Sequence, residues 1–525
     1  MKITLFSLNA SRSHTNLAIR ILKRSLSDAG FSDVTLLERT EKERSFDTLS
    51  ALVAENADLY AFSSYIWNIS AQLTLAENLK KLRPNAIIAF GGPEVSFTAE
   101  EFLQKYPFVD TVLVGEGEKT IVELAKSLEN GSRPRILRAS AYESFVTSPL
   151  PYDQNEARHG SSLYYESARG CPYRCAYCLS GAEEFKKIRA KRVETTLADL
   201  TGFEEFENVK IIKFVDRTFN YDKKRAAAIW QGLLDERFTK QYHFEIAASL
   251  IDGETLAILK KFPKGKIQLE IGVQSTDPRV LAEINRPTDV DSVVKTIETL
   301  YRLGNMHIHA DLIVGLPTDT YRSIRKSYDA LFGKCHDLQL GFLKLLKGSP
   351  LYRKKDAYGY LFHSEPPYEV LSSDTLSFEE TTRLKKIETV HERFVNSHRF
   401  SRAMAVLTDE RSPFALIEAL SDFLPDVTTL SQRDAYVKLV EFDKSLGNDS
   451  RRTALIDAIT LDYLLNEQGR IPAGLPYETF TPSPEVKRAL CERHPELFLP
   501  ATEFYRLFTL GNFAVDRKNK LYFRI

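Results

Sequence analysis

Short apolar runs alternate with amphipathic stretches along roughly the first 130 residues of the chain. The strand-like runs lie at 3–8, 34–37, 59–64, 86–92 and 111–117. The segments between them have helical apolar spacing and lie at 14–29, 47–55, 70–82, 98–105 and 118–129. Strands that alternate with helices predict a parallel sheet covered on both faces. We therefore expect a Rossmann-like, flavodoxin-like α/β domain over residues 1–135, with its ligand beyond the carboxyl ends of the strands.

A second strand series follows after a proline-containing segment, 136–160, which is expected to be a linker. Its strand candidates are 210–216, 243–249, 267–274, 307–316 and 338–346, with helical stretches such as 222–236 and 290–303 between them. These regular intervals predict a second α/β domain over residues 161–370. After residue 370 the apolar spacing becomes helical, at 378–398, 413–423, 431–446 and 453–467. The end of the chain predicts a hairpin with its turn at Lys518–Asn519.

Composition narrows the class of protein. The 525 residues suffice for about three domains. Lys plus Arg and Asp plus Glu both total 71, and this balance argues against a chain that coats nucleic acid or an anionic membrane. No apolar stretch approaches the roughly 18 residues of a membrane span, and the N-terminus resembles a first strand more than a signal peptide. With only five cysteines, a disulfide framework is not expected, and we expect a cytoplasmic protein.

Three of the five cysteines, Cys171, Cys175 and Cys178, fall within eight residues in the spacing C-x3-C-x2-C. Three thiolates on one loop can bind three irons of a 4Fe–4S cluster and leave the fourth iron open to a small molecule. The alternatives are a zinc site, with His159 as a fourth ligand, or buried thiols without a metal. The isolated Cys335 and Cys491 are expected to be buried structural thiols.

The cysteine motif, with Tyr177 before the last cysteine, resembles the signature of the radical S-adenosylmethionine (SAM) superfamily. The resemblance implies a partial β/α barrel, in which the cluster donates an electron to SAM and a 5′-deoxyadenosyl radical forms. Further pieces at predicted strand ends resemble anaerobic coproporphyrinogen oxidases and methylthiotransferases. In place of the usual Gly-Gly-Glu, the second barrel strand here ends in 214–219, which resembles the cobalamin-dependent branch. The SAM contacts that these resemblances imply are Tyr165, Tyr177, Asp216, Glu245, Glu270, Gln274, Ser275, Arg286 and Asp311.

The loops GGPE (91–94) and GEGE (115–118) resemble those of the cobalamin-binding domain found at the N-terminus of many radical SAM enzymes. His14 does not fit the family's Asp-x-His-x-x-Gly motif, so the resemblance implies cobalamin bound without a protein histidine. Trp67 and Asn68 are candidates to cover the lower face of the cobalt, although Trp67 could equally pack in an interdomain core. The cobalamin contacts that the resemblance implies are Ser63, Ser64, Trp67, Asn68, Gly91, Gly92, Pro93, Glu94, Gly115, Glu116 and Gly117.

These resemblances imply a cobalamin-dependent radical SAM methyltransferase that acts at an unactivated carbon of a small or peptide-like substrate. An electron donor such as flavodoxin or ferredoxin is then required. One alternative keeps the cofactors but catalyses a cyclisation or rearrangement. Another is a tRNA-modifying or RNA-binding protein without cobalamin, for which the basic run 186–192 is the candidate surface, although a solvated rim is favoured there. Residues 371–525 resemble the uncharacterised C-terminal extension of some such proteins and are expected to cap the barrel mouth.

Overall fold

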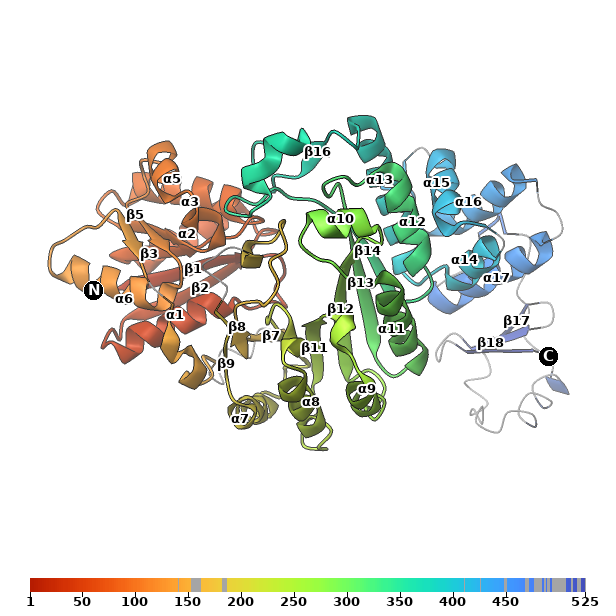
Figure 1. Cartoon of the computed structure of the whole chain (residues 1–525), viewed down its shortest axis with the longest axis horizontal. Coiled ribbons are helices and arrows are strands. Elements are labelled where there is room, and N and C mark those ends of the chain that lie inside the picture. The colour runs from red at the N-terminus through yellow and green to blue at the C-terminus, as the bar shows by residue number, and fades with distance from the viewer. Residues whose placement is uncertain are drawn as a thin grey trace. The chain divides into compact units, whose positions relative to one another are not determined.

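The chain forms two compact units in a computed structural model (Figure 1). The first unit contains Met1–Ser327 and Gly333–Ser377, and the second contains Tyr328–Phe332 and Phe378–Ile525. The structure describes residues 1–139, 141–152, 162–181, 187–409, 411–424, 426–447, 451–467, 472–475, 484–485, 488, 492, 507–510, 513–516 and 521–524.

The first unit begins with a six-stranded sheet whose paired strands are all parallel. Its strands are β1 (Ile3–Asn9), β2 (Val34–Thr40), β3 (Leu59–Ser63), β4 (Ile87–Gly91), β5 (Thr111–Val114) and β6 (Ile136–Arg138). They follow the order β2-β1-β3-β4-β5-β6. From β1, the chain adds β2 on one side and β3 to β6 on the other, so the strand order reverses between β1 and β3. This confirms the expected flavodoxin-like order, in which ligands bind at that reversal.

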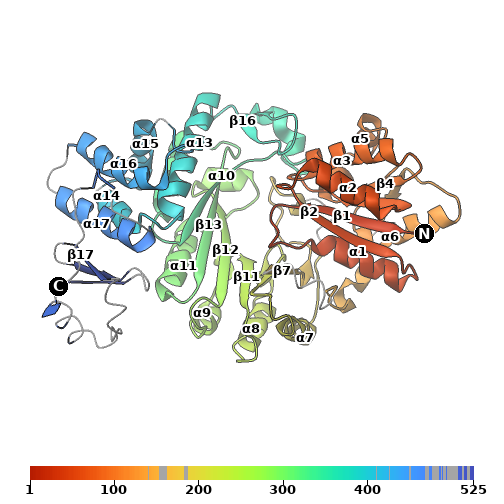
Figure 2. The ribbon, with the colours of Figure 1, turned by 180° about the vertical axis from the view of Figure 1, so that it is seen from behind.

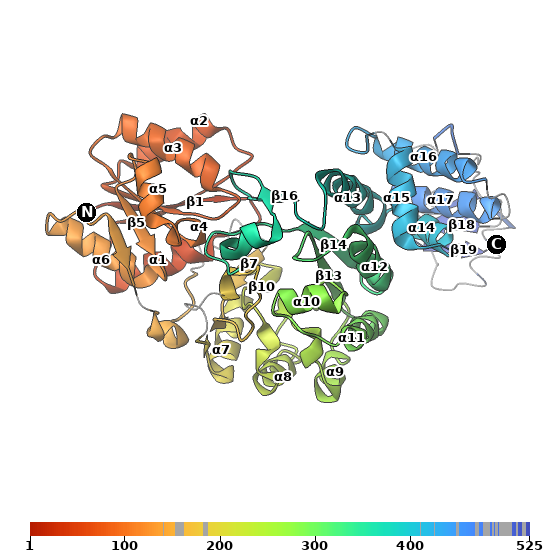
Figure 3. The ribbon, with the colours of Figure 1, turned by 45° about the horizontal axis from the view of Figure 1, so that its top comes forward.

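Helices cover both faces of this sheet (Figure 3). One face packs on α1 (Leu17–Asp28) and α6 (Gly117–Glu129), and the other packs on α2 (Ser45–Glu55), α3 (Ile69–Leu82) and α5 (Ala99–Lys105). Successive residues of β1 show why the strand is apolar throughout: Leu5 enters the first core and Phe6 the second. A short helix, α4 (Pro93–Ser96), follows β4.

The second sheet also has only parallel pairs, and its strands lie side by side in chain order (Figure 2). They are β7 (Ser162–Tyr165), β10 (Ile211–Phe214), β11 (Gln241–Ile246), β12 (Ile267–Gln274), β13 (His307–Val314) and β14 (Asp337–Phe342). The helices between them are α7 (Val193–Glu204), α8 (Lys223–Gly232), α9 (Gly253–Leu259), α10 (Pro278–Glu283), α11 (Val290–Leu303) and α12 (Tyr321–Leu331). Since β7 and β14 are the two edges, the sheet is the expected partial β/α barrel.

Side chains alternate strictly along β12 and β13, buried at one residue and half-buried at the next. The buried residues, such as Leu269 and Ile308, are apolar. The half-buried ones, such as Glu270 and His309, are mostly polar. We call the surface formed by this second set, across β10 to β14, the lumen face.

The N-terminal sheet extends past the boundary expected at residue 135, because Ile136–Arg138 form β6 beside β5. The two-residue strands β8 (Ala168–Arg169) and β9 (Arg189–Ala190) pair around the cysteine segment. Two further short strands, β15 (Leu361–Phe362) and β16 (Val370–Ser372), follow the barrel.

The second unit is mostly helical, as expected. Its helices are α13 (Phe378–His391), α14 (Ser401–Thr408), α15 (Pro413–Phe423), α16 (Gln432–Ser445) and α17 (Arg452–Asn466). Near the end of the chain, β17 (Leu507–Leu510), β18 (Phe513–Asp516) and β19 (Leu521–Arg524) pair antiparallel. The turn predicted at Lys518–Asn519 lies outside the described residues.

Candidate functional site

The three clustered cysteines lie on the loop after β7, where Gly170 has φ +92°, a conformation that favours glycine. Cys175 is buried, and Cys171 and Cys178 are half-buried. The backbone around Cys175 is held from both sides, because Ala176 N donates to Ile284 O (3.0 Å) and Leu351 N donates to Ala176 O (2.7 Å). The loop is therefore shaped by contacts far along the chain.

Within the described residues, no three His, Cys, Asp or Glu side chains converge as ligands of a single metal ion. A cluster makes a different demand, since each of its thiolates binds a separate iron. Cys175 and Cys178 lie close enough to Cys171 for their charges to help raise the pKa of its thiol, after burial, so the loop gathers three thiols as a 4Fe–4S cluster requires. His159, the candidate fourth ligand of a zinc site, lies outside the described residues, as does Cys491. Cys335 is buried, as expected.

Asp216 holds the segment that leads into the cysteine loop through hydrogen bonds. Its buried carboxylate accepts hydrogen bonds from Ser167 N (2.7 Å) and Ser167 Oγ (2.5 Å). Arg225 Nη2 also donates to Ser167 Oγ (2.9 Å). Burial raises the pKa of Asp216 above its ordinary value even though Ser167 bonds and Arg225 oppose the shift. Both carboxylate oxygens accept hydrogen bonds from Ser167, and the SAM contact by Asp216 stays a prediction.

Gln274 and Arg286, predicted to bind SAM, come together at Gly272, and Arg286 also reaches Cys175. Arg286 Nη1 lies 3.5 Å from Cys175 Sγ, and its Nη2 donates to Gly272 O (2.7 Å). Gln274 has φ +71°, and its side chain lies over Gly272 where a Cβ would collide with it. Its buried Oε1 has no hydrogen-bond partner among the described residues. A ribose hydroxyl could satisfy this oxygen, and Arg286 could neutralise a carboxylate, so the pair fits SAM.

Three further predicted SAM residues share the lumen face: Glu245, Glu270 and Asp311. Burial, with Glu270 and Asp311 nearby, raises the pKa of Glu245 to about 7. Burial also raises the pKa of Asp311, whereas a hydrogen bond with His243 lowers that of Glu270. His243 Nε2 lies 3.0 Å from Glu270 Oε2.

Two other predicted SAM residues face elsewhere. Tyr165 is buried on the helix side of β7, where its hydroxyl donates to Asp199 (2.7 Å) and its ring packs edge-on against Phe203. The half-buried Tyr164 lies on the opposite side of the strand. Ser275 is buried, and its Oγ accepts from Asp277 N (3.1 Å), so it caps a turn. Tyr177, by contrast, does lie at the cluster loop, close to Cys175 and Arg286.

The strand-end loops of the first sheet hold most of the predicted cobalamin residues. Gly92 has φ +120°, and a Cβ there would collide with Ser64 O, so this glycine permits close contact between two loops. Ser63 and Ser64 are buried in that contact, and Gly91, Pro93 and Gly115 adjoin it. Gly117 lets α6 approach α1, since a Cβ would lie 2.8 Å from Leu22.

The two candidates for covering the lower face of the cobalt, Trp67 and Asn68, lie on the loop after β3 but differ in burial. Asn68 is fully buried and holds the loop together, with Oδ1 accepting from Tyr65 N (2.8 Å) and Nδ2 donating to Leu8 O (3.1 Å). Trp67 is 56% exposed and stacks on Tyr65, so the interpretation as a buried interdomain residue is wrong. Its ring is free to meet a large flat ligand.

Two predicted cobalamin residues contact the barrel instead. Glu94 accepts from the hydroxyl of Tyr368. Glu116 pairs with Arg189 and Arg169 and accepts from Tyr142 N (2.6 Å). Although burial raises the pKa of Glu116, these partners hold it below its ordinary value.

Arg169, which sequence reasoning did not select, is the centre of this contact. Its guanidinium lies 3.1 Å from Glu116, 2.6 Å from Glu118 and 2.9 Å from Glu166. Since Arg169 precedes Cys171 by two residues, the β5 loop of the first sheet lies directly beside the cluster loop. No local pattern identifies Arg169, because two of its three partners, Glu116 and Glu118, lie about 50 residues earlier in the chain.

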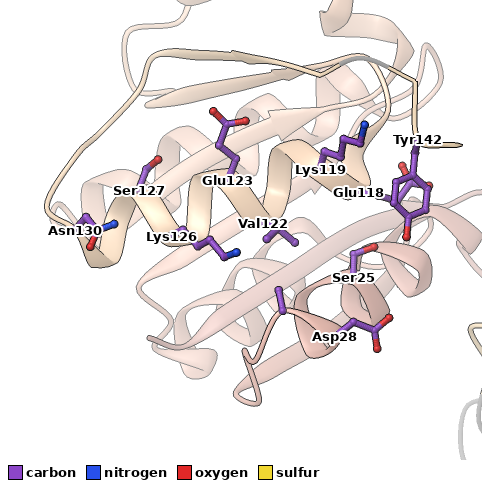
Figure 4. A pocket seen from close by; sticks show the side chains of 11 residues that line it. Ser25, Asp28, Glu118, Lys119, Val122, Glu123, Lys126, Ser127, Asn130 and Tyr142 are labelled. Atoms are coloured by element: carbon purple, nitrogen blue, oxygen red, sulfur yellow. The ribbon is translucent and has the colours of Figure 1, made fainter. Parts of the chain in front are cut away.

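A surface hollow of about 510 Å³ lies between α1 and α6, lined in part by Ser25, Glu118, Lys126 and Tyr142 (Figure 4). None of the predicted cofactor residues lines this hollow, so it is separate from the proposed cofactor sites.

Comparison with known families agrees with this geometry. A B12-binding domain model matches residues 4–125, and a radical SAM superfamily model matches residues 165–331. The chain carries a B12-binding domain and a radical SAM domain. These domains confirm the expected cofactors: cobalamin, a 4Fe–4S cluster and SAM. Residues 356–500 match a family of proteins of unknown function, DUF4080.

Curated relatives carry methyltransferase names. The uncharacterised methyltransferase PH0819 of Pyrococcus horikoshii is 24% identical over 56% of this chain and 68% of its own length. The cobalamin-dependent radical SAM methyltransferase TokK of Streptomyces tokunonensis is 27% identical over 58% of this chain and 49% of its own. The chain thus spans about half of TokK.

Solved structures share the fold. The radical SAM methyltransferase TsrM of Kitasatospora setae, solved with cobalamin and a [4Fe–4S] cluster, matches with a TM-score of 0.56 at 15% identity, over 70% of this chain and 82% of its own. The cobalamin-dependent SAM radical enzyme OxsB, with aqua-cobalamin and SAM bound, matches with a TM-score of 0.57 at 15% identity, over 88% and 83%. Within the described residues, no helix is long and apolar enough to cross a bilayer.

Proposed function

We propose that this chain is a cobalamin-dependent radical SAM methyltransferase that acts at an unactivated carbon of a small or peptide-like substrate. The observation that carries the proposal is the contact of Glu116, at the carboxyl edge of the B12-binding sheet, with Arg169 beside the cluster loop. It brings the loops for the two cofactors together within one compact unit. The methyltransferase names of the relatives favour methyl transfer over cyclisation or rearrangement.

When bound, the cluster, SAM and corrin supply hydrogen-atom abstraction and methyl transfer. The chain's own residues position them. Cys171, Cys175 and Cys178 bind three irons, while Arg286 neutralises the SAM carboxylate and Gln274 Oε1 accepts a hydrogen bond from the ribose. The half-exposed Trp67 would cover one face of the corrin, and Asn68 holds the loop that presents Trp67.

A one-electron donor such as flavodoxin or ferredoxin would reduce the cluster, and a reducing cytoplasm suits the sparse thiols. A small substrate fits better than nucleic acid, because three members of the basic run are already paired. Lys187 pairs with Glu143, Arg189 with Glu116 and Lys191 with Asp199.

Anaerobic reconstitution with iron, sulfide and hydroxocobalamin tests the proposal. After gel filtration we expect about one corrin and one cluster per chain. Incubation with a reductant and SAM carrying a deuterated methyl group should label the corrin, and the product should carry that deuterated methyl group in place of one hydrogen. Failure to retain stoichiometric corrin would contradict the proposal. A product of unchanged mass would favour rearrangement.

A further inference from the structure

Most side chains on the lumen face are ionisable or amide groups, with Ile211 and Ile313 among the aliphatic exceptions. Strand register places Lys213, His243, Gln268 and His307 in one row across β10 to β13. The next row contains Glu245, Glu270, His309 and Asp337. Neither row has an aliphatic member, although the residues between them on the same strands are mostly apolar. A molecule seated on this face must offer polar groups.

Most charges in the two rows are already compensated. His243 pairs with Glu270 (3.0 Å), and His307 pairs with Asp337 (2.7 Å). His309 pairs with Asp311 (3.0 Å) from the row above. Although burial lowers the pKa of His309, Asp311 raises it to about 9, so this histidine is a cation at neutral pH. The charges of these residues are therefore balanced within the lumen face.

Lys213 and Glu245 are the exceptions. Within the part of the chain that the structure describes, neither Lys213 Nζ nor the Glu245 carboxylate has a hydrogen bond or ion pair. Both are half-buried, on neighbouring strands of the same face, with Glu245 two residues beyond the register partner of Lys213. Arg217 lowers the pKa of Glu245 and Lys213 lowers that of Glu270 through space, but neither Lys213 nor Glu245 makes a direct bond to an opposite charge in the described residues. A partly desolvated amine and carboxyl group without direct partners would gain from a ligand that brings both opposite charges.

His243 is a third feature of this position. It is the register partner of Lys213 and lies two residues before Glu245 on the same face of β11. Its residue is only 8% exposed, and its Nδ1 has no hydrogen-bond partner among the described residues. A buried nitrogen without a hydrogen-bond partner destabilises the fold unless a ligand forms a hydrogen bond with it.

We propose that Lys213 and Glu245 bind the two charged ends of a zwitterionic substrate of the amino-acid class, with its ammonium at Glu245 and its carboxylate at Lys213. His243 Nδ1 supplies a further hydrogen bond between them. The inference rests on the proposed function, whose substrate it specifies. It reassigns Glu245 from SAM, which the family resemblance implies, to the substrate, while Gln274 and Arg286 remain with SAM.

Equilibrium dialysis of the reconstituted holoenzyme with SAM against radiolabelled L-amino acids tests the inference. We expect at least one amino acid to bind, and Lys213→Met and Glu245→Gln each to weaken that binding at least tenfold. N-acetylated or methyl-esterified forms, which lack one charge, should compete poorly. Lys210→Met and Glu236→Gln are matched controls at exposed positions, and their binding should equal that of the unmodified protein.

Two outcomes would overturn the inference without touching the cobalamin and cluster assignments of the proposed function, which are tested by corrin retention and corrin labelling and need no substrate. The first is that no labelled amino acid binds, or that the neutral derivatives compete equally. The second is that Glu245→Gln abolishes the change that SAM produces in the electron paramagnetic resonance (EPR) spectrum of the reduced cluster, because Glu245 would then belong to SAM. Cluster and corrin content, measured for every variant, identifies variants that fail to fold.

Discussion

Replacing Arg169 with methionine should destabilise the first unit far more than an ordinary surface substitution. Only 12% of the Arg169 side chain is exposed, and Glu116, Glu118 and Glu166 are 17%, 4% and 21% exposed. Methionine retains apolar contact with Phe145, over which the guanidinium lies, but leaves three partly buried carboxylates with one fewer cation. Breaking a buried pair by removing one partner costs about 3–5 kcal/mol.

Thermal unfolding of the reconstituted protein measures the effect. At roughly 2 °C per kcal/mol for a large domain, the midpoint should fall by about 6–10 °C. Because Arg169 precedes the first cluster cysteine by two residues, iron content should fall as well. Arg138→Met is the matched control, since Arg138 and its partner Glu100 are more than half exposed and such pairs contribute about 1 kcal/mol or less. Equal shifts of the unfolding midpoint for the two variants would refute the claim that the contacts of Arg169 with Glu116, Glu118 and Glu166 stabilise the unit.

Three further predictions concern single positions. Gly92→Ala should lower the free energy of unfolding several times more than Gly131→Ala and should release corrin. A Cβ at position 92 would collide with Ser64 O, whereas a Cβ at position 131 would meet no atom within 4 Å. Equal unfolding midpoints for the two variants would contradict this. Gln274→Asn, which tolerates positive φ but withdraws the amide, should weaken SAM binding about tenfold and leave iron content unchanged, as dialysis with labelled SAM would show. Asp319 is buried and its pKa is raised to about 7 by burial, so its ionisation destabilises the fold as pH rises from about 4 to 7. Asp319→Asn should therefore stabilise the protein at pH 8, by up to about 4 kcal/mol, and the gain should vanish near pH 4; a gain independent of pH would refute this assignment.

Sequence periodicity predicted the strands well where apolar runs are long. The run at 267–274 is β12 to the residue, because alternation between helix-facing and lumen-facing positions leaves one register that buries the apolar set. The edge strand β6 was missed, since three residues in a proline-containing segment carry too little pattern. It forms only because β5 offers it an open edge.

The site residues differ in the same way, since those defined by local sequence could be predicted and those defined by tertiary contacts could not. The cysteine spacing is local and identified the cluster loop. Tyr165 is the residue that the resemblance implies as a SAM contact, but adjacent strand residues face opposite sides, and the packing of Phe203 against β7 places Tyr165 on the helix side. Glu116 was interpreted as a cobalamin contact from a glycine-rich motif, but its partner Arg189 lies 73 residues away. Such pairs depend on tertiary structure, which no local motif contains.

The central claim is that the corrin and the cluster are bound side by side within one unit. EPR spectroscopy of the reconstituted protein, with the corrin in its cobalt(II) form and the cluster reduced, tests it most directly. The account predicts magnetic interaction between the two centres, and loss of that interaction in a Cys175→Ala variant that retains corrin but not the cluster. Two independent, unperturbed spectra from a protein containing both groups in full would contradict it.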